Sequence, residues 1–284
     1  MQSRARLRTH KYLTVTYSVD ANLDFIVDLQ SSARQAHPAC YRVFISRMMR
    51  AMHPPREHRY SDASALARAL CEHIEIELQT ALAARGRASL VVSGGRTPTP
   101  LFNRLAQQNL PWQDIAITLA DERWVATDTD TSNERLLRHE LLRDHAARAP
   151  FFGLKSDAET AALGAQRAWS ALAQIPRPFD VVVLGMGDDG HTASLFPASP
   201  QLAQALDALR APACVAMQAP VAPHERLSLN LAALLDARQV ILHIQGAHKW
   251  AVYQAAKAAG LATDLPIRAV LQQTKLPLEV FWAP

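Results

Sequence analysis

From residue 61 to the C-terminus, the spacing of apolar side chains switches repeatedly between a helical and a strand pattern. In segment 61–86 the large apolar residues recur every four positions, on one face of a helix: Leu66, Leu70, Ile74 and Leu78. This segment begins with a Ser-Asp pair and ends at Gly86, which are typical start and stop signals of a helix. The short run 88–93, "ASLVVS", is apolar and β-branched and predicts a buried strand.

The same alternation continues along the rest of the chain. Apolar runs predict further strands at 115–120, 179–185, 239–246 and 278–282. The segments between them predict helices at 99–108, 131–142, 158–174, 230–236 and 248–258, and Thr131 with Glu134 predicts a capping box in the second of these. Strands that are apolar throughout and alternate with helices are typical of a parallel sheet covered on both faces. We therefore expect an α/β protein with a three-layer α/β/α fold and a mainly parallel sheet.

Residues 1–51 differ from the rest in pattern and in charge. They show no clear helix or strand period, and they carry eight Lys/Arg and three Asp, a net charge of +5. The remaining residues sum to −1, so the overall charge of +4 gives no reason to expect a nucleic-acid partner. We interpret 1–51 as a dispensable N-terminal extension, either poorly ordered or the result of a mis-assigned start, and 52–284 as a single catalytic α/β domain.

Composition narrows the class of protein further. Hydrophobic residues make up 49% of the chain, enough for a large core, yet no stretch approaches the ~20 consecutive apolar residues of a transmembrane helix. Cys40, Cys71 and Cys214 are odd in number and form no CxxC pair, so neither a disulfide framework nor a zinc site is indicated. We expect no metal, no cofactor and no membrane partner, a cytoplasmic location, and a monomer or small homo-oligomer.

The segment "SGGRTP" follows the first predicted strand. Ligands of parallel sheets bind beyond the carboxyl ends of the strands, so this is a candidate binding segment. Its glycines allow a tight turn that presents N–H groups ahead of a helix, an arrangement suited to anions. The candidate phosphate ligands are Ser93, Gly94, Gly95, Arg96 and Thr97. The alternative is an ordinary strand-to-helix turn.

Charged side chains follow the next two predicted strands. After 115–120 comes "DERWV", in which Asp121 and Arg123 are candidate site residues, the alternative being a helix-capping acid paired with an arginine. After 179–185 comes "GMGDDGHTASLFP", whose glycines admit a ligand close to the backbone. Histidine suits proton transfer near neutral pH, so His191 is the candidate acid/base, with Asp188 or Asp189 beside it.

Two further cations complete the set of candidates. Arg226 in "RLSLNL" and Lys249 in "GAHKW" are candidate phosphate ligands, the alternative being solvated surface cations. The other histidines, His243 among them, have no comparable setting and are assigned no role. No HExxH motif or Cys/His cluster suggests a metal.

Taken together, "SGGRTP", "DERWV", "SNERLL", "GMGDDGHTASLFP", "RLSLNL" and "GAHKW" resemble the 6-phosphogluconolactonase members of the glucosamine-6-phosphate isomerase/6-phosphogluconolactonase family. The likeness runs from about Tyr60 to Trp282. It implies the fold of the glucosamine-6-phosphate deaminase/ribose-5-phosphate isomerase type and hydrolysis of 6-phospho-D-glucono-1,5-lactone. The segment "WVATDTDTSN" lacks the Pro and His that the family often shows after "DERWV", which leaves the contacts of that loop open.

The resemblance also implies roles for the candidates. His191 would take a proton from water that attacks the lactone carbonyl, oriented by Asp188 or Asp189. Backbone N–H groups or Arg123 would stabilise the oxyanion. Asp121, which matches the acid that acts as a base in the related deaminases, would contact sugar hydroxyls. The 6-phosphate would bind residues 93–97, Arg226 and Lys249.

Three other functions fit parts of the sequence. A deaminase or isomerase of the same family carries "GxGxxGHIAFNEP" where this chain has "GMGDDGHTASLFP". The segment "TASLFP" after the histidine favours the lactonase. A sugar-phosphate sensor would usually carry a DNA-binding helix pair, and 1–51 shows none. The spacing Gly185, Gly187, Gly190 matches GxGxxG of dinucleotide-binding domains, but no acidic residue ends a second strand about 20 residues later.

Overall fold

The computed structural model describes residues 14–18, 24–28 and 55–284. By its internal contacts the chain divides into two compact units, Met1–Met52 and His53–Pro284. In the first unit, β1 (Thr14–Ser18) and β2 (Asp24–Asp28) form an antiparallel pair. The apolar pattern of 1–51 does not predict these strands, because both contain polar residues among the apolar ones, as in TVTYS and DFIVD. The other residues of that segment, and the prediction that they are poorly ordered, lie outside the described residues.

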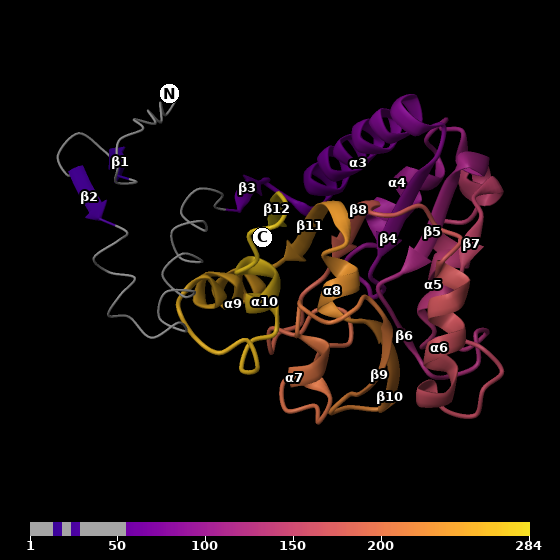
Figure 1. The fold of residues 1–284 in the computed structure, drawn as a ribbon. Coiled ribbons are helices and arrows are strands. Elements are labelled where there is room, and N and C mark those ends of the chain that lie inside the picture. Colours follow the sequence, from indigo (N-terminus) through magenta and orange to yellow (C-terminus); the bar gives the residue numbers. More distant parts are fainter. Residues whose placement is uncertain (1–13, 19–23, 29–54) are drawn as a thin grey trace. The chain divides into compact units, whose positions relative to one another are not determined.

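The second unit is built on a seven-stranded sheet in which every neighbouring pair of strands is parallel (Figure 1). The strand order is β3-β12-β11-β8-β4-β5-β7. The strands are β3 (Arg56–Arg59), β4 (Ala88–Val92), β5 (Ile115–Leu119), β7 (Phe151–Phe152), β8 (Phe179–Leu184), β11 (Ala237–Gln245) and β12 (Leu278–Ala283). All five strands predicted from apolar runs are confirmed. The two edge strands, β3 and β7, escape prediction because one is polar and the other is two residues long.

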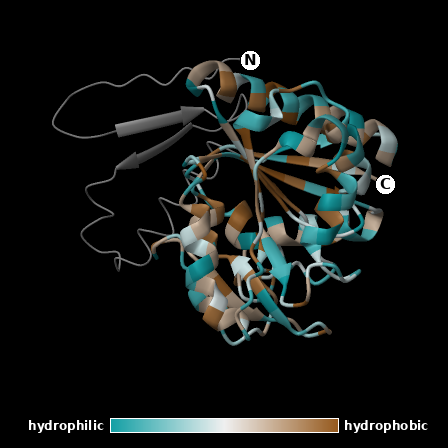
Figure 2. Ribbon diagram, turned by 90° about the vertical axis from the view of Figure 1, so that its right-hand side faces the viewer, coloured by the Kyte–Doolittle hydropathy of each residue, from teal (hydrophilic) through white to brown (hydrophobic). Residues whose placement is uncertain are grey.

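Helices cover both faces of this sheet. α3 (Ala63–Arg85) brings His73 against Phe281 of β12, with 5.3 Å between the ring centroids. α9 (Ala247–Lys257) brings Trp250 against Trp282, the next residue of β12, at 4.8 Å. Successive side chains of a strand point to opposite faces, so the two helices lie on opposite sides of the sheet. The predicted three-layer fold is confirmed, and Figure 2 shows hydrophobic strands between helices with many hydrophilic outer positions.

The remaining helices are α4 (Thr99–Ala106), α5 (Asn133–Glu140), α6 (Ala161–Leu172), α7 (Leu202–Ala205), α8 (Leu231–Leu234) and α10 (Ile267–Leu271). Four of them, α4, α5, α6 and α8, lie at predicted positions, whereas the apolar pattern does not predict α7 and α10. The predicted capping box of Thr131 and Glu134 is wrong. Ser132 is the N-cap of α5, and its Oγ accepts from the backbone N–H of Arg135 at 3.2 Å. The carbonyl of Thr131 instead accepts from the Arg123 guanidinium, which holds Thr131 outside the helix.

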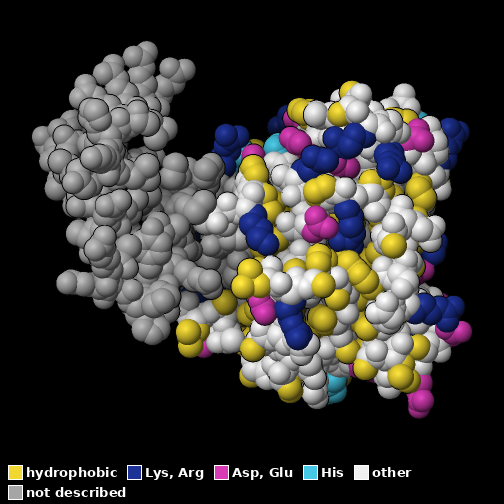
Figure 3. Space-filling model, in the orientation of Figure 1, with side chains coloured by type: hydrophobic (Ala, Val, Ile, Leu, Met, Phe, Trp, Pro, Cys, Tyr) yellow, Lys and Arg dark blue, Asp and Glu magenta, His cyan; other side chains and the backbone are white. Residues whose placement is uncertain are grey.

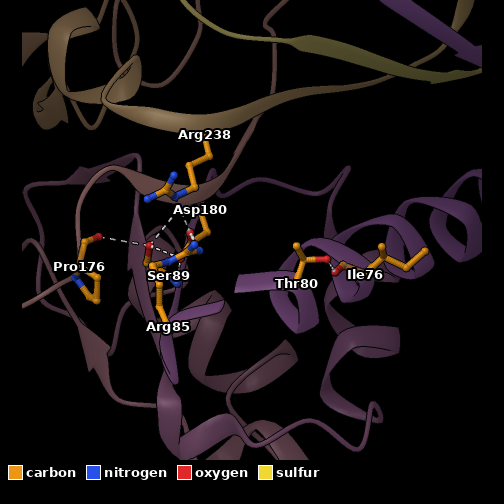
Figure 4. Close-up of polar contacts among 7 residues, drawn as sticks. All are labelled: Ile76, Thr80, Arg85, Ser89, Pro176, Asp180 and Arg238. Atoms are coloured by element: carbon orange, nitrogen blue, oxygen red, sulfur yellow. Dashed lines mark hydrogen bonds and ion pairs between the residues drawn. The ribbon is translucent and has the colours of Figure 1, made fainter. Parts of the chain in front are cut away.

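A buried carboxylate joins the amino ends of the two central strands (Figure 4). Asp180 of β8 accepts hydrogen bonds from the backbone N–H of Ser89 in β4 at 2.9 Å and from its hydroxyl at 3.2 Å. Arg85, at the end of α3, and Arg238 of β11 form ion pairs with the same carboxylate at 2.5 and 3.3 Å. Asp180 therefore links three strands and a helix at the edge of the sheet away from the carboxyl ends.

A second, three-stranded antiparallel sheet lies in the order β6-β10-β9, and the apolar pattern gives no sign of it. It comprises β6 (Asp121–Arg123), β9 (Cys214–Gln218) and β10 (Glu225–Leu229). The chain leaves the parallel sheet at the end of β5 and enters β6 after a single residue, Ala120. This abrupt change of sheet is invisible in a sequence pattern that continues apolar up to Ala120.

The order of the strands identifies where a ligand would bind. From β4 the chain adds β5 and β7 on one side, and it then returns to place β8, β11 and β12 on the other. The direction reverses between β4 and β8, and open α/β sheets bind ligands outside the carboxyl ends of strands at such a point. The segments that follow these two strands are "SGGRTP" and "GMGDDGHTASLFP".

The surface of the described part adds two observations. None of its helices is long and apolar enough to cross a membrane. On the face drawn in Figure 3, Lys and Arg side chains are spread over the surface among acidic and apolar ones. This distribution agrees with the near-neutral charge of the chain beyond residue 51.

Candidate active site

The segments that follow β4, β5, β8 and β11 enclose a cavity of about 430 Å³. Ten of the twelve candidate residues line it: Ser93, Gly94, Gly95, Arg96, Thr97, Asp121, Arg123, His191, Arg226 and Lys249. The other two, Asp188 and Asp189, lie outside the lining. Asn133, Phe196 and His243 also line the cavity, although the sequence does not single them out. Folding thus brings together side chains that are up to 156 positions apart, from Ser93 to Lys249.

The loop after β4 begins with a hydrogen bond to the neighbouring strand, β8. The backbone N–H of Ser93 donates to the carbonyl of Val183 in β8 at 3.0 Å, so the loop starts between the two central strands. The Ser93 hydroxyl is buried and has no hydrogen-bond partner among the described residues. Buried polar atoms are normally paired, so an unpaired hydroxyl in a cavity wall indicates a place for a ligand atom.

Asn133, the first residue of α5, links this loop to β6. Its Nδ2 donates to the backbone carbonyl of Asp121 at 2.9 Å, and its Oδ1 is buried without a partner among the described residues. A Cβ atom at Gly94 would overlap the Asn133 amide, so position 94 has room only for glycine. The motif "SNERLL" resembles the family, but nothing in its local pattern reveals that Asn133 contacts two other motifs.

The small antiparallel sheet arranges the charges of one cavity wall. Arg226 of β10 pairs with Arg123 of β6, and Ser228 pairs with Asp121. Paired residues of antiparallel strands present their side chains on the same face, and residues two apart share that face. Asp121, Arg123 and Arg226 consequently face the cavity together.

Glu122, between Asp121 and Arg123, points the other way and is fully buried. Its carboxylate accepts from the backbone N–H groups of Asn133 and Glu134, each at 2.7 Å, and from the Ser132 hydroxyl at 3.1 Å. It therefore caps the N-terminus of α5, where a negative charge is favoured. The two interpretations of "DERWV" thus apply to different residues of the motif, because Asp121 and Arg123 line the cavity while Glu122 caps a helix.

The two arginines of this wall have like charges side by side. Burial lowers the pKa of Arg226, and the neighbouring charge of Arg123 lowers it further. Arg226 donates from Nε to the carbonyl of Pro223 at 2.7 Å, and Arg123 donates to the carbonyl of Thr131. Neither arginine has a carboxylate at ion-pair distance among the described residues. Planar guanidinium groups bind phosphate and carboxylate oxygens, so this wall is suited to an anion.

Asp121 is itself held by a side chain of the third motif. Its Oδ2 accepts a hydrogen bond of 2.5 Å from the hydroxyl of Ser194, which is fully buried. The backbone N–H of Ser194 in turn faces the Ser228 hydroxyl at 3.3 Å. The segment "TASLFP" therefore contacts the strand-end acid through Ser194, a link between motifs 73 residues apart.

His191 lies in the cavity wall, and its imidazole is held by the Asp189 carboxylate. Its Nδ1 lies 2.6 Å from Oδ1 of Asp189, and the same oxygen accepts from the backbone N–H of His191 at 3.1 Å. Burial raises the pKa of the Asp189 carboxyl, but its hydrogen bonds to His191 and the nearby charge outweigh burial and lower it. The ionised carboxylate keeps the proton on Nδ1 and leaves Nε2 free to accept one. The ring of Phe196 packs against the imidazole at 4.4 Å.

The glycine turn explains this geometry. A Cβ at Gly187 would overlap the His191 ring, and Gly190 has a φ of 76°, which glycine adopts without strain. The turn closes through a hydrogen bond of 3.1 Å from the Gly190 N–H to the Gly187 carbonyl. Its two acids are both exposed and both lie outside the cavity lining, but Asp189 accepts hydrogen bonds from His191. Of the two acids considered from the sequence, Asp189 contacts the histidine, and no contact of Asp188 with it is found among the described residues.

The same turn differs from a dinucleotide-binding turn. In those domains a helix starts at the glycines and directs its N-terminus at the pyrophosphate. Here Gly190 is followed by an isolated bridge between Thr192 and Leu195, and the next helix begins only at Leu202. The GxGxxG spacing in this chain thus makes room for a histidine and not for a pyrophosphate.

Comparisons with known proteins show to which family the chain belongs. Residues 61–282 match the family described as glucosamine-6-phosphate isomerases/6-phosphogluconolactonase. The chain belongs to this family. A 6-phosphogluconolactonase of Rhizobium meliloti (strain 1021) is 44% identical over 227 residues, which are 80% of this chain and 98% of the relative. A 6-phosphogluconolactonase of Pseudomonas aeruginosa is also 44% identical, over 79% of this chain and 93% of the relative.

Solved structures show the same family fold. A crystal structure of a 6-phosphogluconolactonase from Shewanella baltica matches with a TM-score of 0.78 and 48% identity, covering 81% of this chain and 98% of that chain. A monomeric glucosamine-6-phosphate deaminase of the NagB superfamily matches with a TM-score of 0.66 over 80% of this chain, at 16% identity. The second likeness concerns the fold alone. It confirms the expected relation to the deaminase type of fold.

Proposed function

We propose that this member of the family hydrolyses 6-phospho-D-glucono-1,5-lactone to 6-phosphogluconate, in the second step of the oxidative pentose phosphate pathway. The observation that carries the proposal is the contact of 2.6 Å between His191 Nδ1 and Asp189 at the wall of a cavity rich in cationic side chains. A general base at one end and an anion site at the other suit a substrate that has a reactive carbonyl and a phosphate. The names of the relatives support the same substrate.

In the proposed mechanism, His191 acts twice. Its Nε2 accepts a proton from the water that attacks the lactone carbonyl at C1, and the imidazolium then protonates the departing ring oxygen. Asp189 holds the ring and stabilises its charged form. Arg123 and the N–H groups of the glycine turn stabilise the oxyanion of the tetrahedral intermediate. Asp121 accepts hydrogen bonds from the sugar hydroxyls.

The phosphate is a non-reacting part of the substrate whose binding positions the lactone. Residues 93–97, Arg226 and Lys249 would hold it, and its binding energy fixes the lactone relative to His191. Arg226 provides a test of this assignment because it stands beside Arg123. Loss of a phosphate contact in Arg226→Ala should raise KM with little change in kcat. An equal fall of kcat and kcat/KM would move Arg226 to the oxyanion instead.

A deaminase-like activity is the second candidate. In this chain the Ser194 hydroxyl donates to Asp121, so one oxygen of that carboxylate already has a hydrogen-bond partner, which favours a role as a fixed acceptor over a role as a proton carrier. This contact comes from "TASLFP", the segment that differs from the deaminase pattern. Release of ammonia from glucosamine 6-phosphate at a rate above that of lactone hydrolysis would reverse the choice between the two.

The decisive experiment is a coupled assay with freshly prepared 6-phosphogluconolactone, corrected for spontaneous hydrolysis. We expect kcat of His191→Ala to be ~10²–10⁴-fold below wild type, the usual contribution of a positioned acid/base. His139→Ala removes an exposed histidine of α5 and is the matched control, with wild-type turnover expected. Wild-type turnover in His191→Ala would remove His191 from the mechanism.

We further propose that the unit His53–Pro284 carries this activity by itself, in the cytoplasm, and that residues 1–51 are dispensable. All lining residues of the cavity belong to this unit. A chain that starts at Met52 should keep the kcat and KM of the full chain. A large loss of activity in a folded, truncated protein would contradict this proposal.

A further inference from the structure

His243 is a buried histidine in the wall of the cavity, on β11. The residue has an exposed fraction of only 3%, and its Nε2 has no hydrogen-bond partner among the described residues. An unpaired polar atom in a protein interior costs stability, so its presence in a cavity wall needs an explanation. The neighbours of His243 along the strand, Leu242 and Ile244, are fully buried apolar residues, as expected for a core strand.

The charge of Lys249 acts on the imidazole of His243. Burial, together with the nearby ammonium charge of Lys249, lowers the pKa of His243 to about 4. The imidazole is therefore uncharged at neutral pH and carries one N–H. Lys249 lies in the first turn of α9, whose N-cap, Gly246, has no side-chain hydrogen bond to the helix N–H groups. The cavity wall thus contains both a cation, Lys249, and an uncharged imidazole, His243.

We propose that His243 is a phosphate-binding residue, whose Nε2–H donates to an oxygen of the substrate phosphate while Lys249 pairs with its charge. This inference rests on the proposed function, since it takes the phosphate of the lactone as the anion. A neutral donor adds a hydrogen bond without adding a second positive charge near Lys249. It also gives the unpaired nitrogen a partner that is present only when the substrate is bound.

The adjacent residues favour a phosphate over a sugar hydroxyl as the partner. A sugar hydroxyl can form its hydrogen bonds in a site without a cation, whereas a phosphate needs a positive charge as well as hydrogen-bond donors. Ser93, on the loop that follows β4, contributes a second buried polar atom without a partner among the described residues, its hydroxyl, to the same cavity. Two neutral donors and one ammonium group would together surround the three terminal oxygens of a phosphate monoester.

The test compares two lactones and two variants. His243→Leu removes the donor at similar volume, and His243→Gln keeps an N–H donor near the position of Nε2. For the phosphorylated lactone, His243→Leu should raise KM by about 10- to 100-fold with kcat nearly unchanged, since hydrogen bonds to charged groups have this effect on affinity. His243→Gln should recover most of the loss. For glucono-1,5-lactone, which has no phosphate, kcat/KM should be the same in wild type and His243→Leu.

The outcomes separate this inference from the proposed function. An equal loss with both lactones would assign His243 to the sugar or to the fold and overturn the inference, as would an unchanged KM. Binding of inorganic phosphate, measured by calorimetry, requires no turnover, and His243→Leu should weaken it. If wild-type protein binds phosphate through His243 but does not hydrolyse the lactone, the inference stands and the proposed function fails.

A measurement on the wild-type protein covers the case in which His243→Leu does not fold. The Nε2 resonance of His243 is assigned in a histidine ¹⁵N spectrum by its absence from His243→Gln. Saturation with inorganic phosphate should shift this resonance, while that of the exposed His139 stays unchanged. A His243 resonance that does not move at saturation would refute the contact.

Discussion

The burial of His243 in its neutral form should make the stability of the protein depend on pH in a defined direction. The pKa of this imidazole falls from an ordinary 6.5 to about 4 in the folded chain. Above pH 6.5 the group is neutral in both the folded and the unfolded state, and its full contribution to stability is present. As the pH falls from 6.5 to 4, the unfolded chain binds the proton first, so unfolding becomes more favourable.

The magnitude follows from the size of the shift. A difference of about 2.5 pKa units corresponds to roughly 3 kcal/mol at 1.36 kcal/mol per unit, and most of it is lost by about pH 4.5. This is a large part of the 5–15 kcal/mol that typical domains have. His243→Gln has no titrating group at this position, so its stability should fall less than that of wild type over the same range.

Urea unfolding at a series of pH values between 8 and 4.5 measures this effect. The quantity to follow is the difference in unfolding free energy between wild type and His243→Gln, because other titrating groups cancel in it. This difference should shift by about 2–3 kcal/mol against wild type as the pH falls. His139→Gln, which removes an exposed histidine, should parallel wild type. Parallel curves for wild type and His243→Gln would show that His243 is not held neutral.

Three further substitutions probe how the fold positions the site. Gly187→Ala should lower kcat more than it raises KM in the lactonase assay, because the added Cβ overlaps the His191 ring; unchanged kcat would mean that the turn adapts. Glu122→Gln keeps one acceptor oxygen but places an NH₂ group against one of the two N–H donors of α5, and it should cost ~1–3 kcal/mol in urea unfolding; a loss below ~0.5 kcal/mol would contradict its capping role. Asp180→Ala leaves the Ser89 N–H without its acceptor and should cost ~1–3 kcal/mol, yet keep wild-type kcat because it lies at the opposite edge of the sheet.

The sequence predicts the positions of the five long strands and their alternation with helices well. This is because a strand buried on both faces must be apolar throughout, and a helix on a sheet must have an apolar face. The cap of α5 is a different case. Ser132 and not Thr131 is the N-cap residue. Which of the two residues caps the helix depends on their contacts with Glu122 and Arg123, which belong to strand β6. Local spacing contains no information about such a contact.

The candidate site divides in the same way. Glycines, a histidine and charged residues after apolar runs identify the segments 93–97, 121–123 and 185–191, because the carboxyl ends of parallel strands meet at one edge. The antiparallel sheet that aligns Asp121, Arg123 and Arg226 has no such signal, since β6 is only three residues long. The choice of Asp189 over Asp188 depends on the path of the glycine turn.

The sequence by itself thus determines the class of fold, the edge of the sheet that binds a ligand and the motifs that meet there. Only the tertiary structure decides which atoms face the cavity. His243 shows why: along the chain it is one polar residue in an apolar strand, indistinguishable from an ordinary core histidine. Its unpaired Nε2 and its place in the cavity wall arise from loops and a helix elsewhere in the chain. Burial and pairing are properties of the packed molecule, and no local pattern of residues encodes them.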